Sequence, residues 1–438
     1  MTAKKTAGVA LALLLGCGLL SAQSTDDKVV LLSPRNAALG GAHAALADDL
    51  ATLFSNPAGL QSVDPVLRVT EATVNLSGPV FDITGLVVEG IGGTDLATLL
   101  TEPDVQAVLN GLAAGASLSG PVSFGYVGGG LGVGIFSWTE TTFQSVGTLT
   151  LEAMLRETFL INGGYSFRIP LPASWKSHID AGLLLKAFLQ SEVRTVKSVV
   201  DLVSLMSDPA VLLLGQPFTV TAGVGMDAGI RFAVGQWFAL GIAARDLYSP
   251  MSVNEYTSLQ DFLGSGAPVQ SQSAIPMDLS AGMLFSPGLG RLGRHVTDFR
   301  LAVDYRDILD FVLRPAEARN WILHLGVGLE ATLLKILSVR IGFTEGLFAA
   351  GIGLDLSFMK LDAAMYGAEL SSEPGLRPVY NVAIGLRSDL SPREREPRVP
   401  RQPRDRRERP AAAAETENET EEDSTAEEPA GESEETSE

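Results

Sequence analysis

The chain has few of the residues that build metal and thiol chemistry. Its 438 residues include one cysteine, Cys17, so it can form neither an intramolecular disulfide nor a thiolate metal site. The four histidines are far apart and show no metal-ligand spacing: they are His43, His178, His295 and His324. No stretch after residue 20 offers the roughly 20 uninterrupted apolar residues of a transmembrane helix. Metal centres, disulfide scaffolds and helical membrane proteins are therefore not expected.

Catalytic and nucleotide-binding motifs are also missing. The chain has no G-x-S-x-G motif, and the glycines at 288, 290 and 293 are not followed by a helical pattern. The basic segment near the C-terminus lacks interleaved aromatic residues, which argues against nucleic-acid binding. We expect no enzyme activity, no cofactor, no metal and no nucleic-acid partner.

The N-terminus has the pattern of an export signal. Lys4 and Lys5 precede an apolar run from residue 7 to residue 20, and small residues follow. Residues 1–22 are predicted to be a signal peptide cleaved after Ala22, and a loose lipobox ending at Cys17 is the alternative, with Cys17 lipidated. Export without disulfides or a helical span points to a bacterial envelope.

Strict alternation of apolar and polar residues is the main structural signal. From residue 218 to residue 232, Val224 and Met226 share one parity with other apolar residues, while Asp227 and Arg231 lie on the other. This period of two is typical of a strand whose faces meet different environments. In a soluble sandwich the apolar parity would face a core; in an outer-membrane barrel it would face lipid.

The rhythm of strands and connections favours the barrel. About 14 alternating segments are expected at 68–76, 121–127, 130–139, 152–165, 177–190, 217–232, 236–246, 274–286, 296–305, 320–330, 334–343, 347–357, 358–367 and 379–388. Long links at 77–120, 140–151, 191–216, 247–273, 306–319 and 368–378 alternate with short turns, as in outer-membrane barrels, with the tight turn at Glu345 and Gly346 as the exception. A soluble sandwich has no reason to segregate its loops in this way. We therefore predict an all-β fold, a transmembrane antiparallel β-barrel of about 14 strands over residues 67–390.

The polar parity carries many charges that would be costly in lipid, about 2 to 4 kcal/mol each near the bilayer midplane. These charges are therefore predicted to face the lumen, as a network of ion pairs that includes Asp227, Arg231, Asp278, Arg300, Asp304, Arg306 and Arg340. Acids and bases on this parity are balanced, which suits ion pairs holding a plug better than a charge-selective pore.

The segment before the first strand does not alternate. Residues 23–66 are predicted to form an N-terminal hatch or plug, in which alanine-rich helical turns are broken by Gly40 and Gly41. Asn56 before Pro57 is predicted to stop a helix and start a turn. The hatch residues singled out are Asp48, Asp49, Asn56, Pro57, Ala58 and Gly59.

The stretch LGGAHAALADDLATLFSNPAGL resembles the N-terminal signature of the FadL-like outer-membrane transporters, including the PorV-type branch. GLGVGIFS at 130–137 and the run from Gly328 to Gly367 are similar to the same family, the latter to the last strands of the PorV-type branch. The resemblance implies a 14-stranded barrel, a luminal hatch marked by Asn56, Pro57 and Ala58, and passive uptake of long-chain fatty acids or other hydrophobic solutes. The alternatives are a PorV-like role in secretion or surface assembly of exported proteins, and a structural barrel.

An apolar external loop is the candidate landing site for such solutes. The proposed ligand-binding residues lie in the link at 191–216 and are Val199, Val200, Leu202, Val203, Leu205, Met206, Leu212 and Leu213, with Arg194 and Lys197 as candidate partners for a carboxylate. The other reading is that these apolar residues pack on each other as a lid.

The C-terminal residues 391–438 differ in composition from the rest. Eight arginines lie among prolines between Pro392 and Pro410, and twelve acids follow from Glu415 onward. Such a segment cannot bury enough apolar surface to fold alone and is predicted to be a disordered tail in the periplasm. Its arginines are candidates to touch lipid head groups or cell-wall components.

Overall fold

The computed structural model describes Val29 and residues 31–79, 102–147, 149–198, 201, 214–316 and 318–390. The predicted signal peptide and the predicted tail lie outside these residues. Within them, no helix is both long and apolar enough to cross a membrane.

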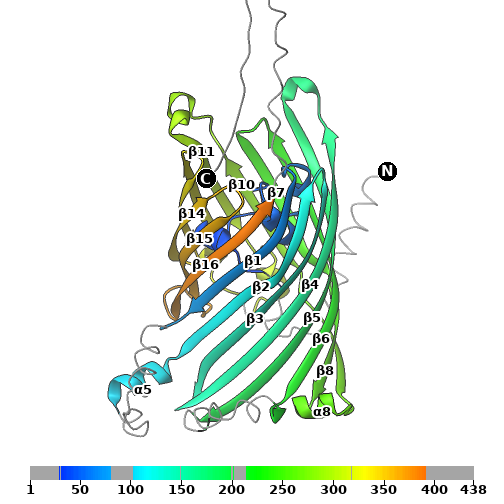
Figure 1. Ribbon diagram of the computed structural model, residues 1–438, viewed down its shortest axis with the longest axis vertical. Helices are drawn as coiled ribbons and strands as arrows, with labels where there is room; N and C mark the ends of the chain where they lie inside the picture. The colour runs from blue at the N-terminus through cyan, green and yellow to red at the C-terminus, as the bar shows by residue number, and fades with distance from the viewer. Residues whose placement is uncertain are drawn as a thin grey trace, which may run out of the picture. The chain divides into compact units, whose positions relative to one another are not determined.

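Fourteen antiparallel strands form a closed barrel (Figure 1). They are β1 (Val66–Ser77), β2 (Ala113–Gly128), β3 (Leu131–Gly147), β4 (Thr150–Pro170), β5 (Ser177–Ser198), β6 (Phe218–Val234), β7 (Phe238–Tyr248), β10 (Asp278–Phe285), β11 (Val296–Tyr305), β12 (Leu325–Leu333), β13 (Leu337–Thr344), β14 (Leu347–Asp355), β15 (Lys360–Glu369) and β16 (Pro378–Leu390). The first and last strands pair from Leu67↔Leu390 to Ser77↔Asn381, and β6 pairs with both β5 and β7. The predicted 14-stranded antiparallel barrel is confirmed.

Beyond the barrel, the chain between β7 and β10 forms a hairpin of two further strands, which the sequence pattern did not predict. β8 (Pro250–Tyr256) follows β7 after one residue and takes over as the partner of β6, and β9 (Val269–Ala274) pairs with β8 and leads into β10. The short helix α8 (Leu259–Leu263) lies between them. About half of the predicted long link at 247–273 is therefore strand.

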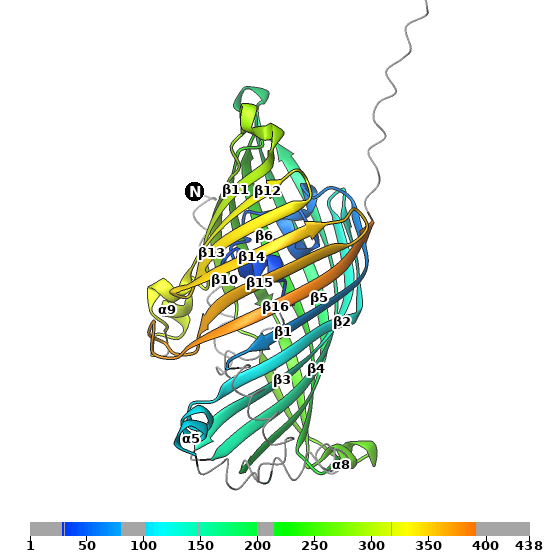
Figure 2. The same ribbon diagram turned by 60° about the vertical axis from the view of Figure 1, so that its left-hand side comes forward.

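The connections between strands lie on two rims of the barrel, and they are on the whole shorter on one rim than on the other. The short-turn rim carries the turns β2–β3, β4–β5, β6–β7, β10–β11, β12–β13 and β14–β15, with η4 (Ala173–Trp175) and η5 (Gly290–Arg294) in two of them. The loop rim carries α5 (Pro103–Asn110), α8, α9 (Asp310–Leu313) and η6 (Trp321–His324). Figure 2 shows β2 to β6 reaching much farther toward α5 and α8 than β11 to β16 do.

Two predicted loops on the loop rim are wrong in extent. β3 and β4 remain paired as far as Gly147↔Thr150, so the expected long link at 140–151 is a tight turn. β5 stays paired with β4 as far as Ser198↔Thr150, so the link predicted to start at residue 191 begins after Ser198. In both cases β-branched residues, joined by Phe143 in β3, extend the strands beyond the stretch of clean alternation.

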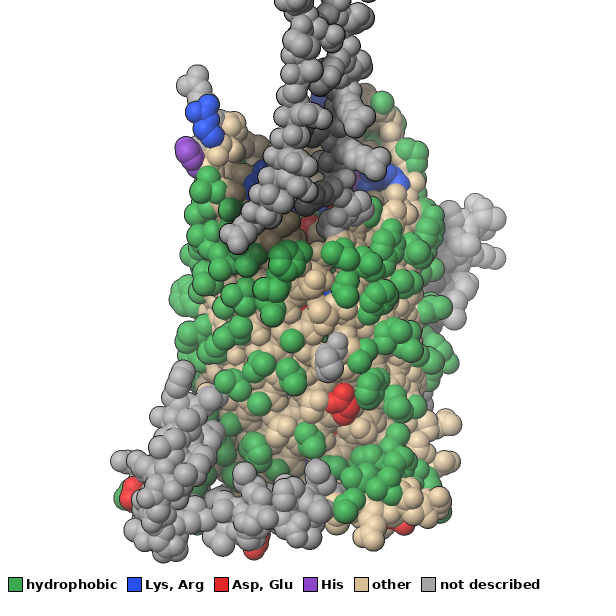
Figure 3. Space-filling view, viewed as in Figure 1, with side chains coloured by type: hydrophobic (Ala, Val, Ile, Leu, Met, Phe, Trp, Pro, Cys, Tyr) green, Lys and Arg blue, Asp and Glu red, His purple; other side chains and the backbone are tan. Residues whose placement is uncertain are grey.

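The apolar parity faces outward. Val224 and Ile230 of β6 expose 54% and 56% of their surface, whereas Asp227 and Arg231 on the opposite face are buried. Figure 3 shows apolar side chains spread over the outside of the barrel with few charged groups among them. An outer surface of this kind is suited to lipid, and the chain is an outer-membrane type of β-barrel.

The interior is filled by the residues that precede β1. We call residues 31–62 the luminal segment; it contains α2 (Pro34–Ala38), η2 (Leu50–Phe54) and η3 (Pro57–Gln61). It lies inside the barrel, drawn in blue in Figures 1 and 2, and η3 contacts β4, β5 and β6. The main hydrophobic core is the contact between this segment and the wall, and its most buried members are Leu50, Leu53, Leu60, Val127, Phe136, Leu160 and Leu184.

Candidate functional site: the luminal segment and its cavity

Short-range capping shapes the luminal segment. Ser33 caps α2 by accepting a hydrogen bond from the Asn36 N–H, and Pro34 fills the first helical position. Gly40 and Gly41 then adopt positive φ angles of 67° and 72°, which end the helix and reverse the chain. The segment therefore folds as short turns, as the sequence predicted, and not as one long helix.

Asn56 links the segment to itself and to the wall. Its side chain is fully buried, its Oδ1 accepts from the Ala58 N–H at 3.0 Å, and its Nδ2 donates to the Ala44 carbonyl at 2.7 Å. The step from Asn56 to Pro57 thus begins η3, as predicted. Pro57, Ala58 and Gly59 are buried with it inside the barrel.

Glycines in the wall let the segment approach closely. A Cβ on Gly326 would lie 2.5 Å from the Gly40 carbonyl oxygen, and a Cβ on Gly241 or Gly342 would overlap the backbone of the segment. These three glycines of the wall therefore leave room for the main chain of the luminal segment.

Arg35 is the charged centre of the contact between segment and wall. It is 5% exposed, and it bonds Glu330 of β12 through Nη2–Oε2 at 2.6 Å and Nε–Oε1 at 3.0 Å. Within the segment it pairs with Asp48 at 2.7 Å and Asp49 at 3.0 Å, and Asp48 in turn pairs with Arg300 of β11. The segment and the wall thus share one ion-pair network.

Asp304 of β11 holds the segment by its main chain. One carboxylate oxygen accepts the N–H groups of both His43 and Ala44 at 2.7 Å. The ring of His43 contacts the Ser55 hydroxyl at 2.8 Å, which ties the two halves of the segment together.

The other predicted lumen residues also point inward. Arg231 donates to the Ala45 carbonyl at 2.9 Å, and the Arg306 guanidinium donates to the Thr344 hydroxyl at 2.7 Å. The remaining predicted members form ion pairs within the wall: Asp227 with Lys186, Asp278 with Arg245, and Arg340 with Glu330 and Asp362.

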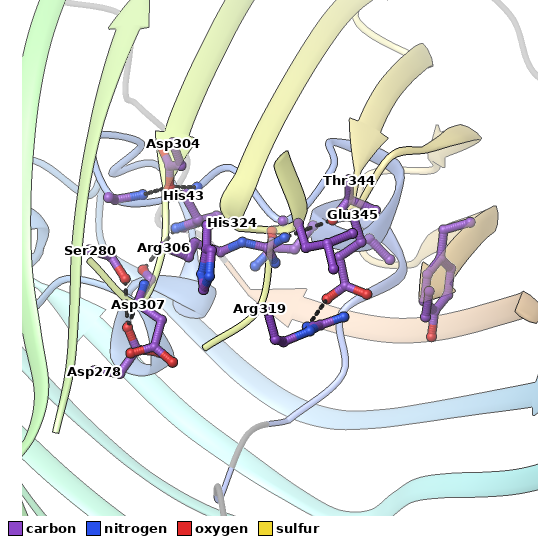
Figure 4. A pocket seen from close by; sticks show the side chains of 18 of the residues that line it. His43, Asp278, Ser280, Asp304, Arg306, Asp307, Arg319, His324, Thr344 and Glu345 are labelled. Carbon is purple, nitrogen blue, oxygen red and sulfur yellow. Dashed lines mark hydrogen bonds and ion pairs between the residues drawn. The ribbon is translucent and has the colours of Figure 1, made fainter. Parts of the chain in front are cut away.

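A cavity of about 770 Å³ lies beside the luminal segment, toward the loop rim. Its segment side is mixed: the apolar members are Leu31, Leu32, Ala37, Ala44, Ala51 and Phe54, and the polar members are Ser33, Asn36, His43 and Ser55. Its wall side comes from β7, β10, β11, β13 and β15 and from the link between β11 and β12, and Figure 4 shows the charged and polar side chains there. The volume is that of a typical small-molecule site.

The wall side carries charges of both signs. The carboxylates are Asp278, Asp304, Asp307, Asp310, Glu345 and Glu369, and the guanidiniums are Arg245, Arg306, Arg314 and Arg319. Most are paired; Arg319 with Glu345 at 3.4 Å and Arg314 with Asp307 at 2.9 Å are examples. The cavity is thus amphipathic, with its apolar side chains mainly on the luminal segment and its charged side chains on the wall.

His43, Asp48 and Asp49 bring three possible metal-ligand atoms within 4.8 Å of one another. Arg35 bonds both oxygens of Asp48 and one of Asp49, however. A guanidinium therefore already fills the position that a cation would take, and the trio is part of the ion-pair network.

The predicted ligand-binding residues fall into two groups. Val199, Val200, Leu202, Val203, Leu205, Met206, Leu212 and Leu213 lie outside the described residues. Arg194 and Lys197 belong to β5, and Arg194 pairs with Glu152 at 2.8 Å and Glu192 at 2.9 Å.

Sequence reasoning did not single out Arg35. The only available signal was its position as the lone basic residue of an alanine-rich segment that precedes a barrel with many lumen-facing acids.

These features define a class of protein: an outer-membrane β-barrel whose lumen is occupied by its own N-terminal segment. No family model and no curated protein matches the chain. Among solved structures, it is similar to the CymD monoaromatic hydrocarbon channel, with 11% identity and a TM-score of 0.44 over 82% of this chain and 97% of that one. It is similar to the Ralstonia pickettii toluene transporter TbuX, with 12% identity and a TM-score of 0.45 over 82% and 98% of the two chains. It is also similar to a Pseudomonas aeruginosa FadL homologue, with 11% identity and a TM-score of 0.42 over 83% and 99%.

Proposed function

We propose that this barrel is an outer-membrane channel for the passive uptake of hydrophobic solutes, long-chain fatty acids among them, and that its luminal segment acts as a hatch. The short-turn rim faces the periplasm and the loop rim faces the exterior. No energy source and no cofactor are needed, because the solute moves down its concentration gradient.

The observation that carries the proposal is the pairing of a filled lumen with an amphipathic cavity on its outer side. Leu50, Leu53 and Leu60 of the luminal segment are buried against the wall inside the barrel, which argues against a wide, water-filled general porin. A cavity next to the plug can bind a solute until the luminal segment moves aside.

The way in would lead over the loop rim. The apolar residues between 199 and 213, which the sequence predicts to bind ligand, supply a landing surface. The solute then passes to the apolar side chains of the cavity at Leu31 and Phe54. Arg194, already paired with two glutamates, is more suited to holding strands β4 and β5 together than to binding a carboxylate.

Uptake into vesicles tests the proposal. The purified full chain is reconstituted into liposomes that contain a trapped fatty-acid-binding reporter, and oleate entry is followed by its fluorescence. The proposal expects entry faster than in protein-free vesicles, and slower entry when the apolar residues from 199 to 213 are replaced by serine. Equal rates with and without a correctly folded barrel would refute it.

A further inference from the structure

The two sides of the barrel wall differ in how far they extend beyond the lipid-facing band. On the long side, Phe159 of β4 and Leu189 of β5 are paired and face outward, and each is 47% exposed. The next outward pair toward the loop rim is Glu157 with Ser191, and a charge on this face ends the apolar band there. Both strands stay paired well past this point, so their remaining residues lie beyond the band.

On the short side the band reaches the loop rim itself. β10, β12, β13 and β14 have 8, 9, 8 and 9 residues, and a tilted strand needs about 9 to 11 residues to cross a bilayer. Phe343 of β13 pairs with Phe348 of β14 next to the turn at this rim, and Phe348 is 73% exposed. In Figure 2, α9 at the end of β11 lies well short of the level that α5 and α8 reach. The links between the short strands therefore begin at the membrane boundary.

The link between β11 and β12 carries an apolar surface at this boundary. We call residues 310–316 and 318–321, which include α9, the rim link. All of its exposed residues that the structure describes are apolar: Phe311, Val312, Leu313, Pro315, Ala316 and Trp321. Val312 and Trp321 expose 64% and 62% of their surface. A contiguous apolar surface of this kind marks an interaction site.

The other side of the rim link is polar and held in place. Asp310 is buried; its carboxylate pairs with Arg314 at 3.0 Å and accepts the Arg319 N–H at 2.9 Å. The Asn320 N–H donates to the Ser372 carbonyl at 2.8 Å, which fastens the rim link to the link between β15 and β16. Asp310 and Arg314 also line the cavity. The rim link is therefore amphipathic, and turning its apolar side inward would break these bonds.

The link between β8 and β9 has a different surface, although it also exposes a large apolar side chain. Leu263 of α8 is 66% exposed, but Glu255, Thr257 and Gln260 are exposed in the same part of the chain. This link also follows strands that lie beyond the barrel. Its mixed surface is suited to water, so an exposed apolar residue alone does not identify a lipid contact.

The apolar side of the rim link is continuous with the lipid-facing band. Tyr305, the last residue of β11, and Phe311 of α9 both contact the ring of His324, with ring centroids 5.8 Å and 5.2 Å apart. Phe311, Trp321 and Phe348 place aromatic side chains at this end of the wall, as in the aromatic girdles of outer-membrane barrels. Continuity with a surface that contacts lipid favours lipid as the partner of the rim link.

We propose that the rim link is an interfacial anchor whose apolar side inserts among the acyl chains of the leaflet nearest the loop rim. Burying Val312 and Trp321 there removes apolar surface from water, which stabilises this placement. Asp310 and Arg314 stay on the cavity side, so the rim link lies between the cavity and the lipid. This inference concerns the membrane partner of the barrel and does not depend on the transport proposal.

Spin-label accessibility tests the inference, in the full chain with Cys17→Ser reconstituted into phosphatidylcholine vesicles. A nitroxide is attached at Val312→Cys or at Trp321→Cys, and its collisions with oxygen, which concentrates among acyl chains, and with a water-soluble nickel chelate are measured. Ile352→Cys on β14 is the lipid control and Leu263→Cys on α8 is the water control; all four side chains are exposed, so the label leaves the packed interior intact. The ratio of oxygen to nickel collisions at both rim-link positions should match that at Ile352 and exceed that at Leu263 severalfold.

Two results would overturn the inference. A ratio at both rim-link positions as low as that at Leu263 would mean that the link faces water. Shielding from both reagents, with spectral broadening that disappears when labelled chain is diluted with unlabelled chain, would assign the surface to a second copy of the chain. Neither result bears on the transport proposal, because the measurement uses no solute.

Discussion

Arg35 in the luminal segment and Glu330 on strand β12 form a two-point ion pair, with Nη2–Oε2 at 2.6 Å and Nε–Oε1 at 3.0 Å, across 295 residues of chain. Both side chains are buried. This pair joins the plug to the barrel through side chains, in a place where water cannot replace either partner.

Replacing Arg35 by glutamine should release the luminal segment and leave the barrel intact. The change leaves Glu330, Asp48 and Asp49 short of a cation, and breaking a buried pair of this kind costs about 3 to 5 kcal/mol. Hydrogen exchange of residues 34–61 should rise steeply, while exchange of β3 to β5 stays slow. The control is Arg194→Gln, which removes an arginine that is about half exposed and also paired with two acids. Unchanged protection of the segment in Arg35→Gln would show that the ion pair does not hold it.

The effect of replacing a wall glycine by alanine should depend on whether that glycine faces the luminal segment or the outside of the barrel. Gly241→Ala places a Cβ against the Ala44 carbonyl and should displace that turn, whereas Gly163→Ala places its Cβ 3.6 Å from a Val133 methyl carbon, an ordinary contact. We expect faster proteolysis within the luminal segment for the first variant only. Equal behaviour of the two variants would mean that the close approach is not required.

The orientation of the outer face can be tested by placing one charge in two environments. Ile230 of β6 and Leu263 of α8 are similarly exposed, 56% and 66%, but only Ile230 lies on a barrel strand. Ile230→Lys should destabilise the barrel in bilayers by about 2 to 4 kcal/mol, and Leu263→Lys should have little effect. Urea unfolding in lipid vesicles measures the change in the free energy of unfolding for both variants. If Ile230→Lys is as stable as the unchanged chain, that face does not contact lipid.

Docking of the luminal segment should weaken in strong acid. Burial alone would raise the pKa of Asp49, but the adjacent ring of His43, with Nε2 3.7 Å from Oδ1, and the positive charge of Arg35 hold it well below its usual range. Because the pKa is lowered only in the docked state, the carboxylate stabilises docking above about pH 4, the ordinary value, and this contribution is lost as the pH falls below it. Protease sensitivity of the segment should thus be constant from neutral pH to about pH 4 and rise below it, and Asp49→Asn should flatten that rise. A rise centred near neutral pH would assign the switch to another group.

Much of the barrel could be read from the sequence because each strand meets two unlike solvents. Val224 and Asp227 report lipid and lumen whatever lies farther along the chain, so local alternation is enough to place them. The hairpin of β8 and β9 was not predicted because Ser249, Pro250 and Pro276 interrupt the alternation of apolar and polar residues. Its residues also lie beyond the barrel, where neither face of a strand must be apolar.

The site was only partly predictable for a different reason. Asn56 and Pro57 have a local turn signature, so their role in the segment's fold was visible. The partners of Arg35 lie 13, 14 and 295 residues away, and its bond to Glu330 depends on how deep the segment sits in the barrel, which no local pattern encodes. The cavity likewise arises from six separate parts of the chain.

The central claim is that the luminal segment must move for a solute to pass, and tethering it to the wall is the most direct test. A Cβ on Gly351 would lie 2.6 Å from the Cβ of Ala38, so Ala38→Cys with Gly351→Cys can form a disulfide after a shift of about 1 Å. Solute entry into vesicles is measured before and after reduction, with each single-cysteine variant as control. The account predicts entry that is blocked when the pair is oxidised and restored on reduction; undiminished entry through the oxidised, tethered barrel would contradict it.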